Sequence, residues 1–336
     1  HNNRLKASLE SETKEINIQQ EFEYLNDSKD TLKILYFNDW ANAYSDKSTA
    51  LAKRFAEEFK KSLHLAKEKD RGGTSIFSIV DDEYRAISWT RTSGRDLIKV
   101  ELNAPIAPGG STKLFFTYTV KLPPNRYTSF GYNNIGGYYL KDWYLTPAVY
   151  NGEWQLYSNK NLEDLYTGIT DSNIIFSYPD SLFLGTNFKE VDITSYTGKQ
   201  VATLEGVSRK SSYIILNAQK KFTKHVTPEL LVVTDLRRTK YDEISQGVSI
   251  HRISRFIHDN LGDFPYEQLL VSEEDFNKNP TYGLNQLPSF IRPYENQFQF
   301  EISFLKTALN NYIKETIFLN PRKEKWVSDT AVSYTH

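Results

Sequence analysis

Residues Phe298–Tyr334 read FQFEISFLKTALNNYIKETIFLNPRKEKWVSDTAVSY, and the first part of this stretch predicts a long helix. Side chains suited to one buried helix face recur there at steps of three and four residues. They are Phe298, Ile302, Leu305, Leu309, Tyr312 and Thr316. Asn320-Pro321 interrupts this pattern, and a second helical segment is expected between Lys325 and Tyr334. The chain therefore ends in a predicted pair of helices.

Length and composition indicate a soluble globular protein. With 336 residues and a mass of 39.0 kDa, the chain is long enough for two domains. Its 39% hydrophobic residues and mean hydropathy of −0.55 exclude a disordered or membrane-embedded chain. The net charge is −1, so no overall positive field attracts nucleic acid. No apolar run is long enough to form a transmembrane segment.

Two residue types are absent from the sequence. Without Cys the chain has no disulfides and no thiolate chemistry, which leaves its compartment open. Without Met, and with His1 in first place, the sequence is not expected to be a complete primary translation product. A removed leader, an internal start or missing residues would each explain this.

Short strand-like runs separated by turn signals fill most of the chain from Ile16 onward. Lys113–Leu122 is the clearest, because it is rich in aromatic and β-branched residues. After about residue 225 the pattern becomes mixed, with a predicted helix over Ser249–Leu261 and a buried strand over Leu269–Val271. We expect a frayed segment over 1–15, a β-rich domain over 16–225 and an incomplete α/β domain over 226–336.

Other patterns that could carry chemistry are weak. His251 and His258 are seven residues apart on a predicted helix, about 10 Å along its axis, which is too far for two ligands of one zinc ion. No G-x-S-x-G nucleophile elbow occurs, and adjacent carboxylates are typical of solvated faces. An aromatic belt could be a recognition surface or part of the core: Tyr132, Tyr138, Tyr139, Trp143, Tyr144, Tyr150, Trp154 and Tyr157.

The order of several loose motifs resembles the front portion of an M1-family aminopeptidase of the gluzincin group. Pro105–Ser111 followed by a strand and Leu122-Pro123 is similar to the family's saddle-shaped β-domain. Trp143–Tyr150 and Phe256–Tyr266 resemble later segments of the family in the same order. Two further segments, Asn38-Asp39-Trp40 and Trp154–Asn161, resemble those of a divergent group of the family from Bacteroidetes-type bacteria. The resemblance implies a mainly β amino-terminal saddle domain followed by the start of an α/β thermolysin-like domain.

The residues that carry zinc chemistry in that family are replaced here. In the family, H-E-x-x-H lies on the first terminal helix, and a glutamate ligand follows on the second. Aligning Tyr334 with the family's tyrosine places Lys306, Thr307 and Asn310 on the H-E-x-x-H positions and Asp329 on the glutamate. These side chains do not supply two imidazoles and a water-activating carboxylate.

The exopeptidase motif G-A-M-E-N is also altered, and its glutamate holds the substrate's amino terminus in the family. Asn279–Gln286 stands in its place and contains no carboxylate. The degenerate positions are Thr281, Tyr282, Gly283 and Asn285. Glu273, Glu274 and Asp275 lie upstream and could substitute only if the loop folded back.

The sequence therefore favours a peptidase-like protein that binds a peptide or protein partner without hydrolysing it and needs no cofactor. Export to the periplasm or cell envelope is expected. The alternative is an active zinc aminopeptidase whose ligands are displaced or lie outside this chain. A structural envelope module is a third hypothesis.

Overall fold

A computed structural model describes residues 1–160, 165–236, 242–278, 296–316, 320–324 and 326. Its contacts divide the chain into two compact units. Unit 1 comprises His1–Leu182 and Glu190–Ala218, and unit 2 comprises Phe183–Lys189 and Gln219–His336. The division at Ala218 falls shortly before the domain boundary predicted at residue 225.

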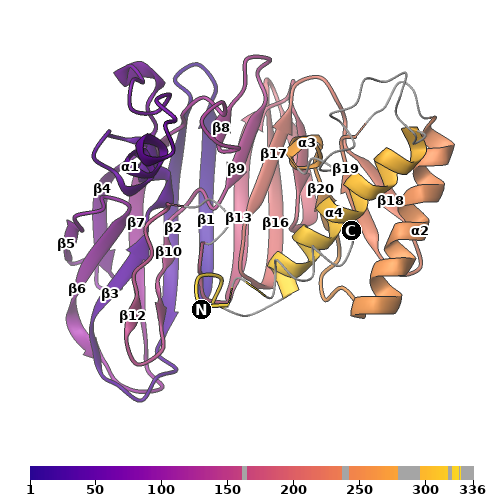
Figure 1. The fold of residues 1–336 in the computed structure, drawn as a ribbon. Coiled ribbons are helices and arrows are strands. Elements are labelled where there is room, and N and C mark those ends of the chain that lie inside the picture. Colours follow the sequence, from indigo (N-terminus) through magenta and orange to yellow (C-terminus); the bar gives the residue numbers. More distant parts are fainter. Residues whose placement is uncertain (161–164, 237–241, 279–295, 317–319, 325, 327–336) are drawn as a thin grey trace. The chain divides into compact units, whose positions relative to one another are not determined.

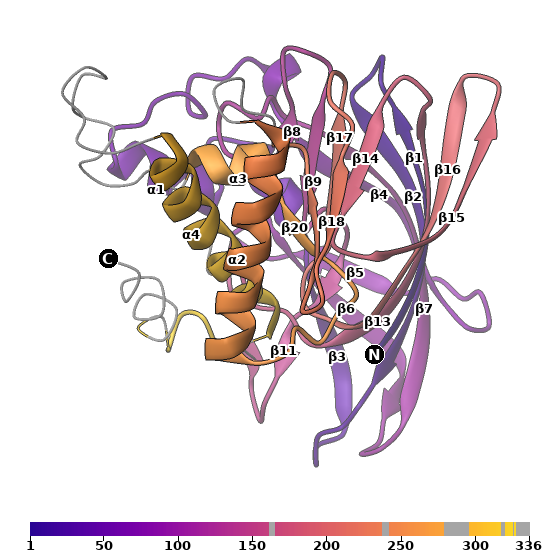
Figure 2. The ribbon, with the colours of Figure 1, turned by 90° about the vertical axis from the view of Figure 1, so that its right-hand side faces the viewer.

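A seven-stranded sheet forms the larger part of unit 1, in the order β15-β16-β13-β1-β2-β7-β4 (Figure 1). Along each central strand, alternate side chains are buried, so that one face of the sheet packs on the core. The strands are β1 (Asn2–Glu10), β2 (Glu15–Leu25), β4 (Gly73–Asp81), β7 (Ser111–Lys121), β13 (Thr170–Pro179), β15 (Lys189–Tyr196) and β16 (Lys199–Arg209). At one edge, β15 and β16 form an extended hairpin (Figure 2).

The expectation of a frayed segment over residues 1–15 is wrong. β1 lies inside the sheet, antiparallel to β2 and parallel to β13. Leu5, Ala7 and Leu9 are buried, while the polar residues between them face outward. The polar composition of this segment predicted fraying, because its outward side chains are polar. Alternation of only three apolar residues is sufficient for a strand that has neighbours on both sides.

A second sheet covers the buried face of the first within unit 1. Its strands, in the order β10-β3-β6-β5, are β10 (Thr146–Pro147), β3 (Leu32–Asn38), β6 (Leu97–Ile106) and β5 (Ser88–Arg91). The ring of Phe37 in β3 lies 5.6 Å from that of Phe22 and 4.9 Å from that of Phe116, centroid to centroid. These edge-on contacts join the two layers, since β2 and β7 carry the partner rings.

Shorter elements complete unit 1. The strands are β8 (Gly131–Tyr132), β9 (Tyr138–Lys141), β11 (Val149–Tyr150), β12 (Trp154–Gln155) and β17 (Tyr213–Asn217). The helices are η1 (Trp40–Tyr44), α1 (Ala50–Glu57) and η2 (Glu68–Asp70). Thr49 caps α1, because its side chain accepts a hydrogen bond from the Ala52 amide.

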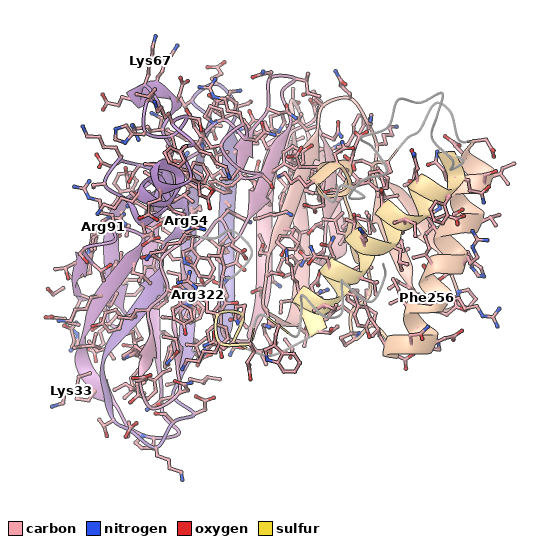
Figure 3. All side chains as sticks on the ribbon, in the orientation of Figure 1. Lys33, Arg54, Lys67, Arg91, Phe256 and Arg322 are labelled. Carbon is pink, nitrogen blue, oxygen red and sulfur yellow. The ribbon has the colours of Figure 1, made fainter. Side chains whose placement is uncertain are left out.

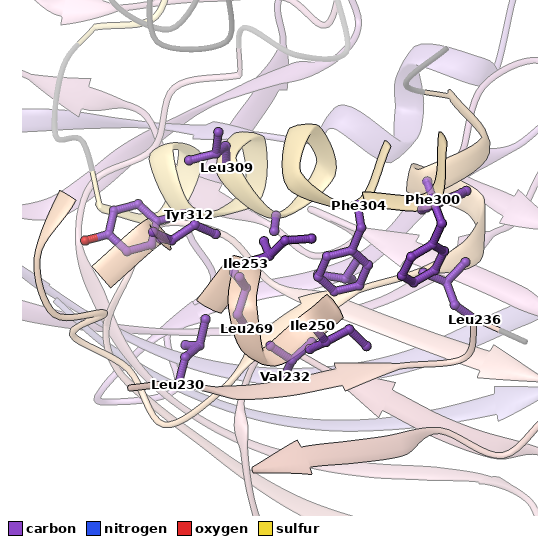
Figure 4. Packing of buried hydrophobic residues seen from close by; sticks show 14 of the residues in the cluster. Leu230, Val232, Leu236, Ile250, Ile253, Leu269, Phe300, Phe304, Leu309 and Tyr312 are labelled. Atoms are coloured by element: carbon purple, nitrogen blue, oxygen red, sulfur yellow. The ribbon is translucent and has the colours of Figure 1, made fainter. Parts of the chain in front are cut away.

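In its described residues, unit 2 combines a small sheet with the helices α2, α3 and α4. β18 (Thr223–Val226) pairs antiparallel with β19 (Leu231–Thr234), which pairs parallel with β20 (Leu269–Val271). The remaining elements are β14 (Phe183–Thr186), α2 (Glu243–Leu261), α3 (Glu273–Lys278) and α4 (Asn296–Thr316). Side chains of α2, α4, β19 and β20 meet in one apolar cluster (Figure 4).

The long helix of the terminal stretch is present as α4, but its buried face differs from the prediction. Phe300, Phe304 and Ala308 lie in the cluster, together with Leu309 and Tyr312. Phe298, which the spacing placed on the buried face, is 44% exposed. The helix carries apolar residues on two adjoining stripes, and its packing partners decide which stripe is buried.

Candidate functional site

Three of the positions that the predicted alignment assigns to the zinc motif, Lys306, Thr307 and Asn310, lie on α4, and two of them are buried. The side chains of Lys306 and Thr307 are 4% and 0% exposed, while Asn310 is partly exposed. The Thr307 hydroxyl donates a hydrogen bond to the Ser303 carbonyl of its own helix, at 2.8 Å. Burial lowers the pKa of the Lys306 ammonium. This stretch of α4 therefore presents a cation and a hydroxyl that already has a partner.

Asn311 fixes α4 on the small sheet, a role that sequence reasoning missed. Its side-chain amide donates to the carbonyl of Leu270 in β20 at 2.8 Å, and the residue is buried. Gln268, just before β20, donates to the carbonyls of Thr186 and Phe188 at 2.8 and 2.7 Å. These side-chain amides donate hydrogen bonds to backbone carbonyls in and beside short strands. The sequence does not show which polar residues take this role.

Tyr312 joins α4 to the end of α2. Its hydroxyl lies 3.2, 3.2 and 3.3 Å from the carbonyl oxygens of Leu261, Gly262 and Asp263. A helix C-terminus leaves such carbonyls without partners inside the helix, and a hydroxyl can donate to one of them at a time. The tyrosine ring therefore belongs to the apolar cluster, while its hydroxyl caps the C-terminus of α2.

The side chains of Lys306 and Thr307 on α4 do not fit a zinc ion. Zinc in proteins takes thiolate, imidazole or carboxylate ligands, whereas Lys306 and Thr307 offer an ammonium group and a hydroxyl. Within the described parts of the chain, no group of three or more His, Cys, Asp or Glu side chains could hold a metal ion. Asp329, Thr281, Tyr282, Gly283 and Asn285 lie outside the described residues, so their predicted roles stay predictions.

The acidic residues that precede Asn279–Gln286, where the sequence predicts an altered exopeptidase motif, have local partners. Glu273 pairs with Lys220 at 2.5 Å, and Glu274 pairs with Lys278 at 3.0 Å along α3. Asp275 accepts a hydrogen bond from the Ser272 hydroxyl at 2.9 Å. These contacts occupy all three carboxylates at the start of α3.

The two helix histidines are separate surface groups. Nδ1 and Nε2 of His258 lie 3.1 Å from carboxylate oxygens of Asp259 and Asp263, respectively. The hydrogen bond to Asp259 raises the pKa of His258. His251 is exposed on the same helix, as is Phe256, whose ring lies at the surface of α2 (Figure 3).

The aromatic belt divides between core and partial exposure. Tyr138, Tyr139, Trp143 and Tyr144 are buried. The rings of Tyr150 and Trp154 are partly exposed and lie 5.0 Å apart. Four members of the belt therefore belong to the core of unit 1, and because Tyr138 and Tyr139 are neighbours in β9, both faces of that strand are covered there.

Comparisons with known proteins show an M1 peptidase fold. An M1 zinc metallopeptidase from Deinococcus radiodurans matches with a TM-score of 0.59 and 11% identity, over 100% of this chain and 68% of that chain. A mutant from the same organism, bound to a Tyr-Ser-Ala substrate, matches with a TM-score of 0.59 and 12% identity, over 100% and 69%. A third structure, a two-domain mutant bound to L-tryptophan, matches at 0.57 and 11%, over 100% and 69%.

At 11–12% sequence identity, these comparisons show only that the fold is shared. The sequence matches no protein-family profile and no curated protein. The prediction of a mainly β chain with an M1-type amino-terminal domain and the start of the following α/β domain is confirmed. In the described residues, no helix is both long enough and apolar enough to cross a membrane.

Proposed function

We propose that this chain is an M1 peptidase-like protein with degenerate zinc and exopeptidase motifs, which binds a peptide or protein without hydrolysing it. The observation that supports the proposal is the burial of Lys306 and Thr307 on α4, two residues that the predicted alignment assigns to the zinc motif. An ammonium group in this place repels a divalent cation, and its burial limits screening by water. The proposed protein therefore works without zinc or another cofactor.

Binding without hydrolysis is supported by the chemistry of the two altered motifs. Asn279–Gln286 contains no carboxylate to pair with a free α-amine. A peptide would therefore be held by its backbone and side chains rather than by its amino terminus. Solved neighbours with the same fold are bound to a tripeptide substrate and to amino acids, which makes a peptide the ligand class to test first.

Metal analysis with an activity assay tests the first half of the proposal. The purified protein is incubated with excess zinc, passed through a desalting column and analysed by mass spectrometry for bound metal. It is then assayed with alanyl-, leucyl- and arginyl-p-nitroanilide. We expect far less than one zinc per chain and no turnover that 1,10-phenanthroline inhibits. Stoichiometric zinc with chelator-sensitive turnover would establish the alternative, an active zinc aminopeptidase.

A restored motif tests the alignment itself. The triple variant Lys306→His, Thr307→Glu and Asn310→His rebuilds H-E-x-x-H on α4. If Asp329 lies near these positions, the variant should bind zinc more tightly than the wild type, because two imidazoles and a carboxylate then converge. The matched control moves the same three residue types to Ile302, Ser303 and Lys306, one helical turn earlier. Equal zinc affinity in both variants would contradict the alignment.

Peptide binding and export need separate measurements. Calorimetry with Tyr-Ser-Ala and with the same peptide acetylated at its amino terminus should give similar dissociation constants, because no carboxylate is expected to meet the α-amine. A strong preference for the free amine would contradict the non-exopeptidase hypothesis. Export to the periplasm or envelope stays a proposal, and fractionation of cells that express the natural gene tests it.

A further inference from the structure

A tight hairpin in unit 1 carries an exposed tyrosine where glycine is the usual residue. Between β4 and Ala86, the Tyr84 amide donates to the Asp81 carbonyl, and the Asp81 amide donates to the Arg85 carbonyl, both at 3.0 Å. This pattern is a three-residue loop whose last residue takes a left-handed conformation, and Tyr84 has φ of 60°. Local sterics favour glycine there, so the tyrosine is not explained by the turn.

The side chain of Asp81 holds this loop in place. Its two carboxylate oxygens accept hydrogen bonds from the amides of Glu83 and Arg85, at 3.1 and 2.9 Å, and from the side chain of Asn103, at 2.9 Å. The carboxylate itself is buried. The loop is therefore preorganised, and it presents Tyr84 with 77% of the residue surface exposed.

The Tyr84 ring stacks on a neighbouring strand and forms a flat aromatic platform. Its centroid lies 5.6 Å from that of Phe115 in β7, and the two ring planes differ by 19°. Phe77, in the adjoining strand β4, is 68% exposed. One face of the tyrosine rests on Phe115, which leaves the opposite face open to a ligand.

Beside this platform, the outward face of three adjacent strands forms a strip of uncharged hydroxyl and amide groups. In the strand register, Ser78, Thr117 and Gln19 form one row, and Ser75, Thr119 and Asn17 form the next. All six residues are at least partly exposed. The strip runs about 14 Å along β7 from Phe115 to Thr119, at about 3.4 Å per residue.

We propose that Tyr84, Phe115 and this hydroxyl–amide strip bind a neutral oligosaccharide. The flat C–H face of a sugar ring stacks well on an exposed aromatic face, and neighbouring hydroxyls exchange hydrogen bonds with Ser, Thr, Asn and Gln. The six strip residues carry no charge, and Glu21, in register with Phe115, lies 3.7 and 3.8 Å from the cationic groups of Lys113 and Arg4. The strip therefore favours a neutral ligand over a nucleic acid or charged peptide, which would need unpaired counter-charges. This function is independent of the peptide binding proposed for unit 2.

Affinity electrophoresis in native gels tests the proposal. The probes are hydroxyethylcellulose, xyloglucan, galactomannan and laminarin, and calorimetry with the matching hexasaccharide follows for any that retards the protein. We expect retardation by at least one probe. The dissociation constant should rise about tenfold in Tyr84→Gly, the usual effect of removing an aromatic anchor. Raising NaCl from 50 to 500 mM should change it by less than about twofold, since a neutral ligand has no charge for salt to screen.

The variants separate binding from folding. Glycine suits the backbone conformation at position 84, so Tyr84→Gly should fold normally. The matched control is Tyr196→Gly, which removes a tyrosine 62% exposed on β15 and should bind like the wild type. Failure of all four probes, or equal affinity of wild type and Tyr84→Gly, would overturn the proposal. So would a dimer in sedimentation velocity that Tyr84→Gly abolishes, because the platform would then be a protein contact.

Discussion

Glycine in place of Tyr84 is expected to give a more stable protein than alanine at the same position, the reverse of the usual order. A non-glycine residue at φ near 60° costs about 1–2 kcal/mol, which alanine retains and glycine removes. Glycine in turn gives the unfolded chain more freedom, worth roughly 0.4–1 kcal/mol. Both substitutions lose the stacking on Phe115, so that term cancels in the comparison. The difference of the two terms is roughly 0–1.6 kcal/mol, so glycine should exceed alanine by about 0.8 kcal/mol in the free energy of unfolding.

Urea unfolding followed by far-ultraviolet circular dichroism measures this difference. With equal slopes for the two variants, the midpoint of Tyr84→Gly should lie above that of Tyr84→Ala. Tyr196→Gly and Tyr196→Ala provide the control, because Tyr196 is not among the residues with positive φ and alanine should then be at least as stable as glycine. If alanine is as stable as glycine at position 84, the left-handed conformation does not strain the chain, and the argument for a functional tyrosine loses its basis.

Three further predictions concern unit 2. Gly185→Ala should destabilise the protein by about 1–3 kcal/mol in thermal unfolding, because an added Cβ would lie 2.2 Å from the Phe222 ring; Phe222→Leu should restore part of the loss. Tyr312→Phe should lower the free energy of unfolding by about 0.5–1.5 kcal/mol in urea, through loss of the hydroxyl that closes α2; an unchanged midpoint would contradict this role. The hydrogen bond to Asp259 raises the pKa of His258, so the protonated imidazole stabilises the fold fully below the unfolded pKa near 6.5. This stabilisation disappears as pH rises through the folded pKa. In urea unfolding, the wild type should therefore be more stable than His258→Gln at pH 5.5, and the two free energies of unfolding should converge at pH 9.

The sequence by itself determined the elements whose side chains alternate clearly. Lys113–Leu122 predicted a strand that the structure places at Ser111–Lys121, because its aromatic and β-branched residues suit a half-buried sheet. Ser249–Leu261 predicted the greater part of α2, whose Ile250, Ile253 and Ile257 lie in the cluster. The order of loose motifs was enough to predict an M1-type fold, since an ordered series constrains a fold more than any single motif does.

Tertiary structure alone decided which surfaces of these elements are buried. β1 has few apolar residues, and it is a strand because β2 and β13 supply hydrogen-bonding partners on both sides. α4 offers two apolar stripes, and the cluster with α2 and β20 takes the one with Phe300 and leaves Phe298 exposed. A local pattern specifies the periodicity of an element, whereas its burial depends on residues distant in the chain. For the same reason the exposed tyrosine in a left-handed turn, and the platform that it forms with Phe115, became visible only in three dimensions.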